Sequence, residues 1–391
     1  MKRLIICCDG TWQDAGCTFP TNVAKIAASI KPVANNGTIQ SVYYGAGIGT
    51  NGIWNKIFGG GLGIGIDFSI KDAYRFICLN YKPGDELYMF GFSRGSYLVR
   101  SLAGLIYNSG LLRPEHLDKL DCKGCEINAY QLYRNRNDDF KPGSEIAKKF
   151  RFKFCVNDPY CIGDNQGRVP IRLLACWDTV GSLGLPPIGI FNIKAFYLPW
   201  LIKRFPGKYR FHDIRLSKII VNALHAVSID ERRKVFNVTL MAKDDEKMDS
   251  NGNVRTVTGE IQKIRQVWFP GDHPSVGGGV KALQGLSDAT LYWVIEQTEQ
   301  LDLGLEFDLS RIPYKPDPGK FDYKTSFSKI DWLNLLGLIW RKLNDETHFD
   351  TDIHRSAKLR WRDCDKYRPE TLKEKFEKEM NMWKGREKVN F

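Results

Sequence analysis

A serine lies between two glycines in residues 91–95, which read Gly-Phe-Ser-Arg-Gly, and this segment could carry nucleophilic chemistry. Residues 86–90 before it are strand-like, and residues 97–107 after it have the apolar spacing of a helix. Gly-x-Ser-x-Gly between a strand and a helix is typical of a nucleophile elbow, whose sharp turn projects the serine Oγ above a sheet. The pattern therefore predicts that Ser93 is a catalytic nucleophile; the alternative is that Ser93 only caps the following helix.

A serine nucleophile needs a base, and we predict that His273 supplies it. His273 follows the strand-like residues 264–269 in a glycine-flanked loop, from which an imidazole can reach a serine at the same sheet edge. His225 lies in an apolar stretch that reads as a helix, so we interpret it as a packed or hydrogen-bonded structural histidine. The remaining histidines lie in segments less suited to a base, and they are His116, His212, His348 and His354.

The acid that orients the histidine is expected between the serine and the histidine in the chain. Asp178 directly follows the strand-like residues 171–177, where a carboxylate can accept a hydrogen bond from the imidazole Nδ1–H. The alternative is that Asp178 is a turn or cap residue. Asp272 is too close in sequence to His273 to orient it easily, and Asp288 lies at the start of a helical pattern.

Backbone amides must also bind the oxyanion that forms during ester hydrolysis. One donor is expected to be the amide of Arg94, which follows the nucleophile. A second is expected from the loop of Asp9, Gly10 and Thr11 after the first strand-like run, because its glycine lets amides approach a ligand. We expect the backbone around Asp9 to matter, rather than its carboxylate.

Ten cysteines raise the question of a metal site. Cys122, Cys125, Cys155 and Cys161 could supply four thiolates to zinc, although the wide spacing of the second pair is poor for a zinc knuckle. The chemistry predicted for Ser93 needs no metal and no organic cofactor.

The first eight residues are too short for the apolar core of a signal peptide, and no run of about 18 apolar residues occurs. We therefore predict a cytoplasmic location without obligatory disulfides, and leave open peripheral membrane association or secretion without a signal. The net charge of +12 is moderate for this length, and our first interpretation is that it serves solubility; the alternative is attraction to anionic surfaces such as phospholipid headgroups or nucleic acid. Nucleic acid is not an expected partner, because the sequence has no run of like charges and no Gly/Arg tract.

Strand-like segments alternate with helical ones along most of the chain, which predicts a doubly wound, mostly parallel α/β sheet. The expected strands are residues 4–8, 41–44, 86–90, 171–177, 234–238 and 264–269. The expected helices are residues 22–31, 65–79, 97–108, 217–228 and 286–299.

Two insertions interrupt the alternation, at about residues 113–168 and 186–212, and we interpret them as lids or pocket walls at the carboxyl edge of the sheet. The second insertion is aromatic with basic margins, which suits a lipid surface, and the alternative is that these side chains pack down as a lid or core segment. The predicted domains are a catalytic domain at 1–305 and a C-terminal extension at 306–391, packed on it.

Several motifs in one order resemble a family of α/β-hydrolase-type domains that includes the phospholipase effectors of type VI secretion systems, in their first lipase class. The matching stretches are residues 8–12, 47–49, 81–95, 177–184, 225–233 and 268–279. The resemblance covers about residues 1–305 and implies a triad of Ser93, Asp178 and His273 with esterase or lipase activity. The short C-terminal portion departs from the secreted effectors, which have a large membrane-anchoring domain.

The sequence thus predicts an α/β-hydrolase-like serine hydrolase that cleaves a carboxylic ester, with a lipid or phospholipid ester as the expected substrate. The alternative is a non-catalytic binding module that keeps the fold and uses the pocket for recognition. The oligomeric state is not predicted.

Overall fold

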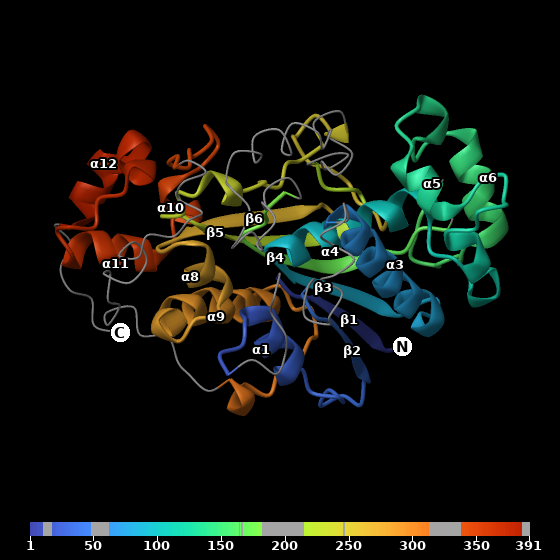
Figure 1. The fold of residues 1–391 in the computed structure, drawn as a ribbon, viewed down its shortest axis with the longest axis horizontal. Helices are drawn as coiled ribbons and strands as arrows, with labels where there is room; N and C mark the ends of the chain where they lie inside the picture. Colours follow the sequence, from blue (N-terminus) through green and yellow to red (C-terminus); the bar gives the residue numbers. More distant parts are fainter. Residues whose placement is uncertain are drawn as a thin grey trace, which may run out of the picture.

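Six parallel strands form one sheet in the order β2-β1-β3-β4-β5-β6 (Figure 1). The computed structural model describes residues 1–10, 18–47, 62–163, 165, 167–181, 215–244, 247–312 and 338–384. The strands are β1 (Arg3–Cys8), β2 (Gln40–Gly45), β3 (Glu86–Phe92), β4 (Ile171–Trp177), β5 (Ile220–Ser228) and β6 (Lys263–Phe269). The predicted doubly wound parallel α/β fold is confirmed.

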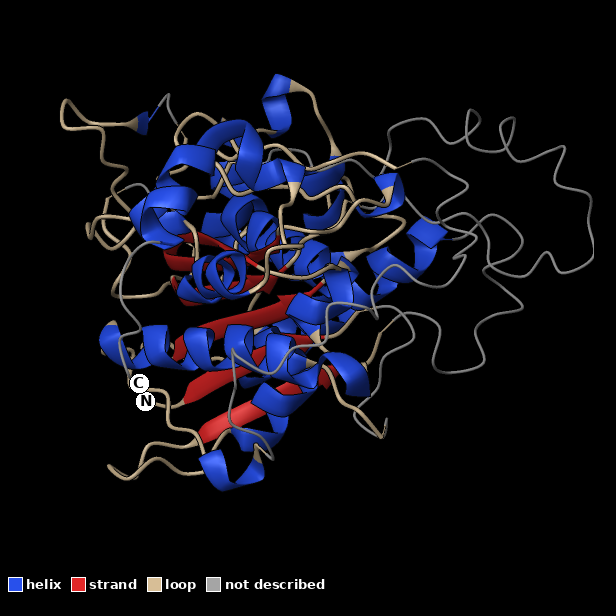
Figure 2. Cartoon of the chain, turned by 90° about the vertical axis from the view of Figure 1, so that its left-hand side faces the viewer, coloured by secondary structure: helices blue, strands red, loops and turns tan. Residues whose placement is uncertain are grey.

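The α-helices mostly connect the strands, and Figure 2 shows them on both sides of the sheet. They are α1 (Asn22–Ser29), α3 (Leu62–Asn80), α4 (Arg94–Ser109), α5 (Ala129–Arg134), α6 (Glu145–Phe154), α8 (His273–Gly277), α9 (Gln284–Gln300), α10 (Phe349–Asp352), α11 (Arg355–Asp363) and α12 (Glu370–Lys384). Short 3-10 helices are η1 (Pro114–Leu120), η2 (Asp138–Phe140), η4 (Lys234–Phe236), η6 (Lys281–Leu283) and η7 (Leu309–Arg311). Among the described helices, none combines the length and apolar character needed to cross a lipid bilayer.

Two predicted elements are wrong in type. Residues 217–228, predicted as a helix, contain strand β5, and residues 234–238, predicted as a strand, contain η4. Every residue of β5 is buried, so its nearly continuous apolar run carries no alternation that would separate a strand from a buried helix. Within this segment, residues 234–236 form a 3-10 turn and Val238 makes an isolated β-bridge with Val180, so the segment does not form a strand.

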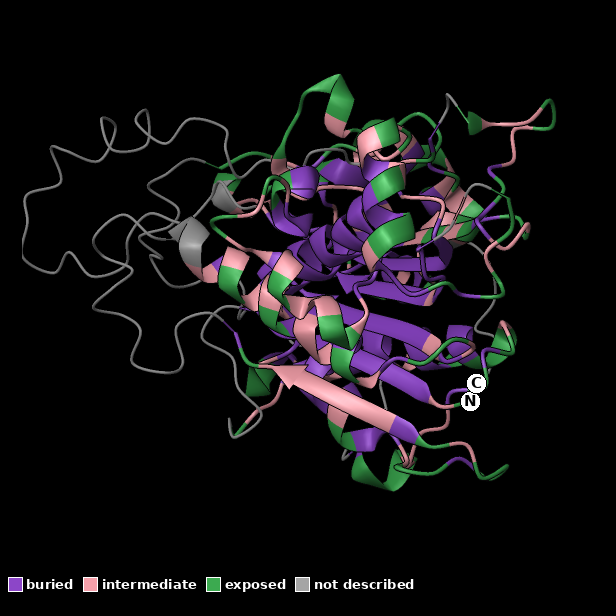
Figure 3. Ribbon diagram, turned by 90° about the vertical axis from the view of Figure 1, so that its right-hand side faces the viewer, coloured by how far each residue is buried: buried purple, intermediate pink, exposed green. Residues whose placement is uncertain are grey.

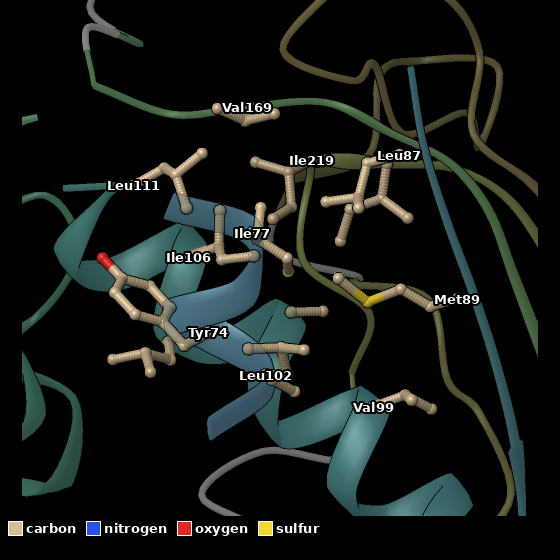
Figure 4. Packing of buried hydrophobic residues seen from close by; sticks show 14 of the residues in the cluster. Tyr74, Ile77, Leu87, Met89, Val99, Leu102, Ile106, Leu111, Val169 and Ile219 are labelled. Atoms are coloured by element: carbon tan, nitrogen blue, oxygen red, sulfur yellow. The ribbon is translucent and has the colours of Figure 1, made fainter. Parts of the chain in front are cut away.

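Alternation of side chains along β1 divides the core into two layers. Leu4 and Ile6 pack in one cluster with α3 and α4, whereas Ile5 and Cys7 pack in another with α1 and α9. Figure 4 shows the first layer, in which Tyr74 of α3 lies among apolar side chains of α4 and the sheet. Figure 3 shows the sheet as mostly buried, with the edge strand β2 less so. Both faces of the sheet are therefore covered by apolar side chains. A polar functional site is expected at the ends of the strands rather than on either face.

The insertion at residues 113–168 does not lie over the carboxyl edge, so its interpretation as a lid is wrong. Asp158 accepts hydrogen bonds from Tyr81 Oη at 2.5 Å and from the Gly84 amide at 3.1 Å, and both donors precede β3. Figure 1 shows α5 and α6 at the opposite end of the sheet from α8. The reason is the direction of α4, which runs back from the carboxyl edge and delivers the chain to the amino edge. The second insertion, residues 186–212, lies outside the described residues.

The part of the chain after residue 338 packs against β5 and β6, as Figure 1 shows for α10 and α11. Trp268 of β6 shares a buried cluster with Ile353 and Trp361, and its carbonyl accepts a hydrogen bond from the His354 amide at 3.0 Å. Leu303 and Leu305 instead belong to the core beneath α1 and α9. The boundary at residue 305 stays a prediction.

Gly95 lies so close to the backbone after β1 that no side chain fits there. A Cβ atom at Gly95 would be 1.9 Å from the carbonyl oxygen of Cys8 and 2.7 Å from that of Asp9. We expect Gly95→Ala to lower the free energy of unfolding by about 3 kcal/mol, because backbone atoms would have to move. Gly143→Ala is the matched control, since a Cβ atom there meets nothing within 4 Å. Urea unfolding measures both variants, and equal midpoints for the two would contradict the expectation.

Candidate active site

Ser93 occupies the turn between β3 and α4 in a strained backbone conformation. Its φ is 56° and its ψ is −118°, a region that a residue other than glycine rarely adopts. The Ser93 amide donates to the carbonyl of Trp177 at 3.0 Å, and the Ser96 hydroxyl donates to the Gly91 carbonyl at 2.7 Å. Although Ser93 is the N-cap residue of α4, its side chain makes no capping hydrogen bond. The geometry therefore argues against the alternative that Ser93 only caps this helix.

Asp178 and His273 meet at the carboxyl edge of the sheet, beside this turn. Asp178 directly follows β4, is completely buried, and accepts a hydrogen bond from the Ser228 amide at 3.0 Å. His273 begins α8, and its Nδ1 lies 2.6 Å from Asp178 Oδ2. Because an ionised carboxylate only accepts hydrogen bonds, the proton between them belongs to Nδ1 of His273. In neutral His273 the other ring nitrogen, Nε2, is then free to accept a proton.

The His273 ring contacts two aromatic rings. Its centroid is 4.7 Å from that of Phe92 and 4.8 Å from that of Phe236, with the Phe236 ring nearly parallel at 12°. The His273 amide also donates to Glu231 Oε2 at 3.1 Å. Since Phe92 is the residue before Ser93, these contacts bring the imidazole to the nucleophile turn.

Arg341 also binds Asp178, although nothing in the sequence pointed to it. Nη1 lies 2.5 Å from Asp178 Oδ1, and Nη2 lies 3.0 Å from Oδ2. Burial alone would raise the pKa of the Asp178 carboxyl, but the charge of Arg341 and the hydrogen bond and charge of His273 hold it well below its usual range. No spacing or motif linked Arg341 to the site, because it lies in the tail that lacks the strand and helix alternation.

The loop after β1 also reaches the nucleophile turn. A Cβ atom at Gly10 would lie 3.5 Å from that of Ser93, so the backbone of this loop lies close to the serine. The Asp9 carboxylate accepts hydrogen bonds from the Gly10 amide, the Thr21 hydroxyl and the Tyr44 hydroxyl, each at 2.7 Å. These contacts give the carboxylate a role in shaping the loop.

The other two residues of the predicted oxyanion site differ in what the structure says of them. Arg94 is the first residue of α4, so its amide lies at the helix start, where backbone N–H groups lack partners within the helix. Its side chain is buried, and this burial lowers the pKa of the guanidinium to about 10. Thr11 lies outside the described residues.

His225 is a buried structural histidine on β5 rather than on a helix. Its Nδ1 lies 3.0 Å from Gln266 Oε1, and its Nε2 accepts a hydrogen bond from the Thr179 amide at 3.2 Å. Burial lowers the pKa of His225 to about 4, so the ring is neutral near pH 7. Both ring nitrogens therefore have partners in the protein.

The four cysteines considered for zinc do not converge. Cys122 and Cys125 form a disulfide, so their sulfurs are bonded to each other. The Cys155 thiol donates to the Ser109 carbonyl, and the Cys161 thiol donates to the Arg168 carbonyl. Across the described residues, no group of three or more His, Cys, Asp or Glu side chains could hold a metal ion. The zinc hypothesis for these four cysteines is wrong.

Asp230, two residues after β5, is a buried carboxyl with a strongly raised pKa. Burial raises its pKa to about 7, against the hydrogen bond that Oδ2 accepts from the Gly271 amide at 2.6 Å. In the unfolded chain the aspartate pKa is about 3.9, so the folded protein binds more protons than the unfolded chain between about pH 4 and 7. The contribution of Asp230 to stability is therefore present below about pH 4 and is lost as the pH rises to about 7.

We expect Asp230→Asn to remove this pH dependence. The melting temperature of the variant relative to the wild type should rise between pH 5 and pH 8, because only the wild type must ionise a buried group. Asp345→Asn, at an exposed position, is the control and should give a difference that does not change with pH. A flat difference for Asp230→Asn would contradict the raised pKa. Differential scanning fluorimetry at several pH values measures both.

Comparisons with known proteins bear on residues 2–297, which match the family model for the catalytic domain of the type VI secretion (T6SS) phospholipase effectors, Tle1-like. The uncharacterized protein YEL023C of Saccharomyces cerevisiae is 28% identical over 256 residues, which cover 60% of this chain and 32% of the yeast protein. The chain thus spans about a third of the length of that relative.

Two solved structures are more distant. An uncharacterized protein from Pseudomonas aeruginosa has a TM-score of 0.37 and 16% identity, covering 81% of this chain and 48% of that one. ClbQ from the colibactin NRPS/PKS pathway has a TM-score of 0.35 and 13% identity, covering 78% of this chain and 99% of that one.

Proposed function

The chain belongs to the Tle1-like phospholipase effector family through its catalytic domain, and we propose from this premise that it hydrolyses carboxylic esters of lipids. Ser93 is the nucleophile, His273 the base and Asp178 the acid of this proposal. The observation that carries it is the 2.6 Å contact between His273 Nδ1 and Asp178 Oδ2 beside a serine with a φ of 56°. A buried acid–base pair next to a strained serine is the arrangement that activates a hydroxyl for acyl transfer.

In the first half of the reaction, Nε2 of His273 takes the proton from Ser93 Oγ as the oxygen attacks the acyl carbonyl. The carbonyl carbon becomes tetrahedral, and Asp178 stabilises the imidazolium that forms. His273 then gives its proton to the leaving alcohol, and an acyl-enzyme remains on Ser93.

In the second half, water attacks the acyl-enzyme as His273 takes its proton. The bond between Ser93 Oγ and the acyl carbon then breaks, His273 returns the proton to Ser93 Oγ, and the fatty acid leaves. The amides of Arg94 and of the Asp9 to Thr11 loop bind the oxyanion in both halves. The position of Gly10 near Ser93 supports this role, because a backbone without a side chain can approach the reacting carbonyl. No metal or organic cofactor takes part.

The lipid substrate is supported by the family and by the charge of the chain. A net charge of +12 attracts the protein to anionic phospholipid surfaces, where an ester substrate is concentrated. We propose peripheral contact of this kind rather than insertion into the bilayer.

A fluorophosphonate probe tests the proposal directly. Ser93 should attack phosphorus and displace fluoride, leaving a covalent label that mass spectrometry places on the peptide containing Ser93. The wild type should also release fatty acid from phospholipid vesicles, and it should hydrolyse p-nitrophenyl butyrate to butyrate and p-nitrophenol. A folded wild type that neither labels nor hydrolyses any of these esters would instead support a binding module on the same fold.

A further inference from the structure

Arg341 stands outside the residues that match the catalytic domain family, yet it contacts the acid of the proposed triad. We infer that Arg341 is a positioning residue, which fixes the Asp178 carboxylate and sets the charge that His273 experiences. This inference rests on the proposed function. It assigns part of the catalytic machinery to the C-terminal part of the chain.

The contacts of Arg341 reach two residues that touch the His273 ring, Asp178 and Phe236. Besides the two contacts with Asp178, Nη1 donates to the Ser228 hydroxyl at 2.6 Å, and Nη2 donates to the Phe236 carbonyl at 2.6 Å. Phe236 carries the ring that stacks on His273. The Arg341 guanidinium thus donates to the Asp178 carboxylate, which accepts from the imidazole, and to the backbone carbonyl of Phe236, whose ring stacks on the imidazole.

The segment that carries Arg341 is itself fixed to the loop after β5. Leu338 pairs with Arg233 as an isolated β-bridge, and the Ile339 amide donates to the Arg232 carbonyl at 2.8 Å. The Arg232 guanidinium also lies 4.5 Å from the centroid of the Trp340 ring. Each of the three residues before Arg341 therefore contacts the loop after β5. These contacts fix the segment that carries Arg341 into the site.

Burial makes the charge of Arg341 matter. Its side chain is 3% exposed and that of Asp178 is 0% exposed, so water screens neither charge effectively. Nη2 of Arg341 and Nδ1 of His273 share the same acceptor, Oδ2 of Asp178. Arg341 therefore partly neutralises the carboxylate that attracts the imidazolium and also prevents the carboxylate from rotating. Its removal should change both the geometry and the electrostatics of the base.

Kinetics of Arg341→Met and Arg341→Lys on p-nitrophenyl butyrate test the inference. Arg341→Met should lower kcat about 10²-fold with KM changed less than about twofold, because the base is misplaced while substrate contacts remain. The acidic limb of its kcat/KM profile should move to higher pH, because Asp178 then acts on the base with its full charge. Arg341→Lys should keep that limb near its wild-type position with kcat about tenfold lower, because an ammonium cannot make two parallel bonds to a carboxylate.

Lys342→Met is the matched control, since the Lys342 side chain is 75% exposed and pairs with Glu374 away from the site. It should leave kcat and the pH profile unchanged. Added millimolar guanidinium should restore part of the kcat of Arg341→Ala and should not affect Lys342→Met. A merely structural role for Arg341 would produce neither this rescue nor the shift of the acidic limb.

Ser228→Ala covers the case in which the Arg341 variants do not fold. It removes one acceptor of the guanidinium and leaves the Ser228 amide on Asp178, so kcat should fall about threefold to tenfold at a near-normal melting temperature. Wild-type kcat and pH profiles in the folded variants would overturn the inference, provided that the wild type is active. A wild type that lacks hydrolysis and labelling would instead overturn the proposed function, and the inference with it.

Discussion

Ser93→Ala is expected to lose ester hydrolysis by at least about 10⁴-fold and to lose fluorophosphonate labelling entirely. The reason is that triad members act as a unit, so removal of the nucleophile leaves His273 and Asp178 with nothing to activate. His273→Ala should lose a similar factor in kcat. Initial rates on p-nitrophenyl butyrate and on phospholipid vesicles measure both variants.

The backbone of Ser93 supplies a second, independent readout. A φ of 56° is costly for serine and for alanine but not for glycine, so Ser93→Ala should be about as stable as the wild type. Ser93→Gly should be equally inactive yet more stable by up to about 1 kcal/mol in urea unfolding. Turnover near the wild-type rate in either folded variant would exclude Ser93 as the nucleophile. Loss of stability in Ser93→Gly would contradict the strained turn.

The sequence predicted the parallel sheet because strands and helices alternate with clear turns between them. It placed Asp178 and His273 at strand ends, and parallel strands bring those ends to one edge regardless of their distance along the chain. Their contact at 2.6 Å follows from that topology. That they act with Ser93 as a triad remains the proposal that the variants test.

Other features could not be predicted because they depend on three-dimensional context. The segment that forms β5 was predicted as a helix because a strand buried on both faces has no alternating pattern. Residues 113–168 have turn and helix signals but none that says which edge of the sheet they cover. Arg341 was missed because its role comes from burial against Asp178, and the chain between residues 178 and 341 gives no local sign of it.

Asp178→Asn is expected to cost activity and stability together, unlike Ser93→Ala. The carboxylate accepts four hydrogen bonds, from the Ser228 amide and Arg341 Nη1 at Oδ1 and from His273 Nδ1 and Arg341 Nη2 at Oδ2. An asparagine has only one side-chain oxygen, so its NH₂ group must replace either Oδ1 or Oδ2 and then faces the donors that the replaced oxygen accepted from. If it faces His273, the ring must accept at Nδ1 and carry its proton on Nε2, which can then no longer take the proton of Ser93.

We therefore expect kcat to fall about 10⁴-fold in Asp178→Asn, with the free energy of unfolding lower by about 3–5 kcal/mol because the Arg341 guanidinium stays buried without its counter-ion. The lowered pKa of Asp178 fixes the sign of the pH dependence: its stabilising contribution is present above about pH 4 and is lost as the pH falls toward the folded-state pKa. The stability gap between wild type and variant should accordingly narrow below about pH 4. Urea unfolding at pH 7 and pH 3 measures it, and combining Asp178→Asn with Arg341→Met should cost less than the sum of the two single changes. Additive costs, or a gap that does not depend on pH, would mean that the buried pair does not hold the acid of the site in its ionised form.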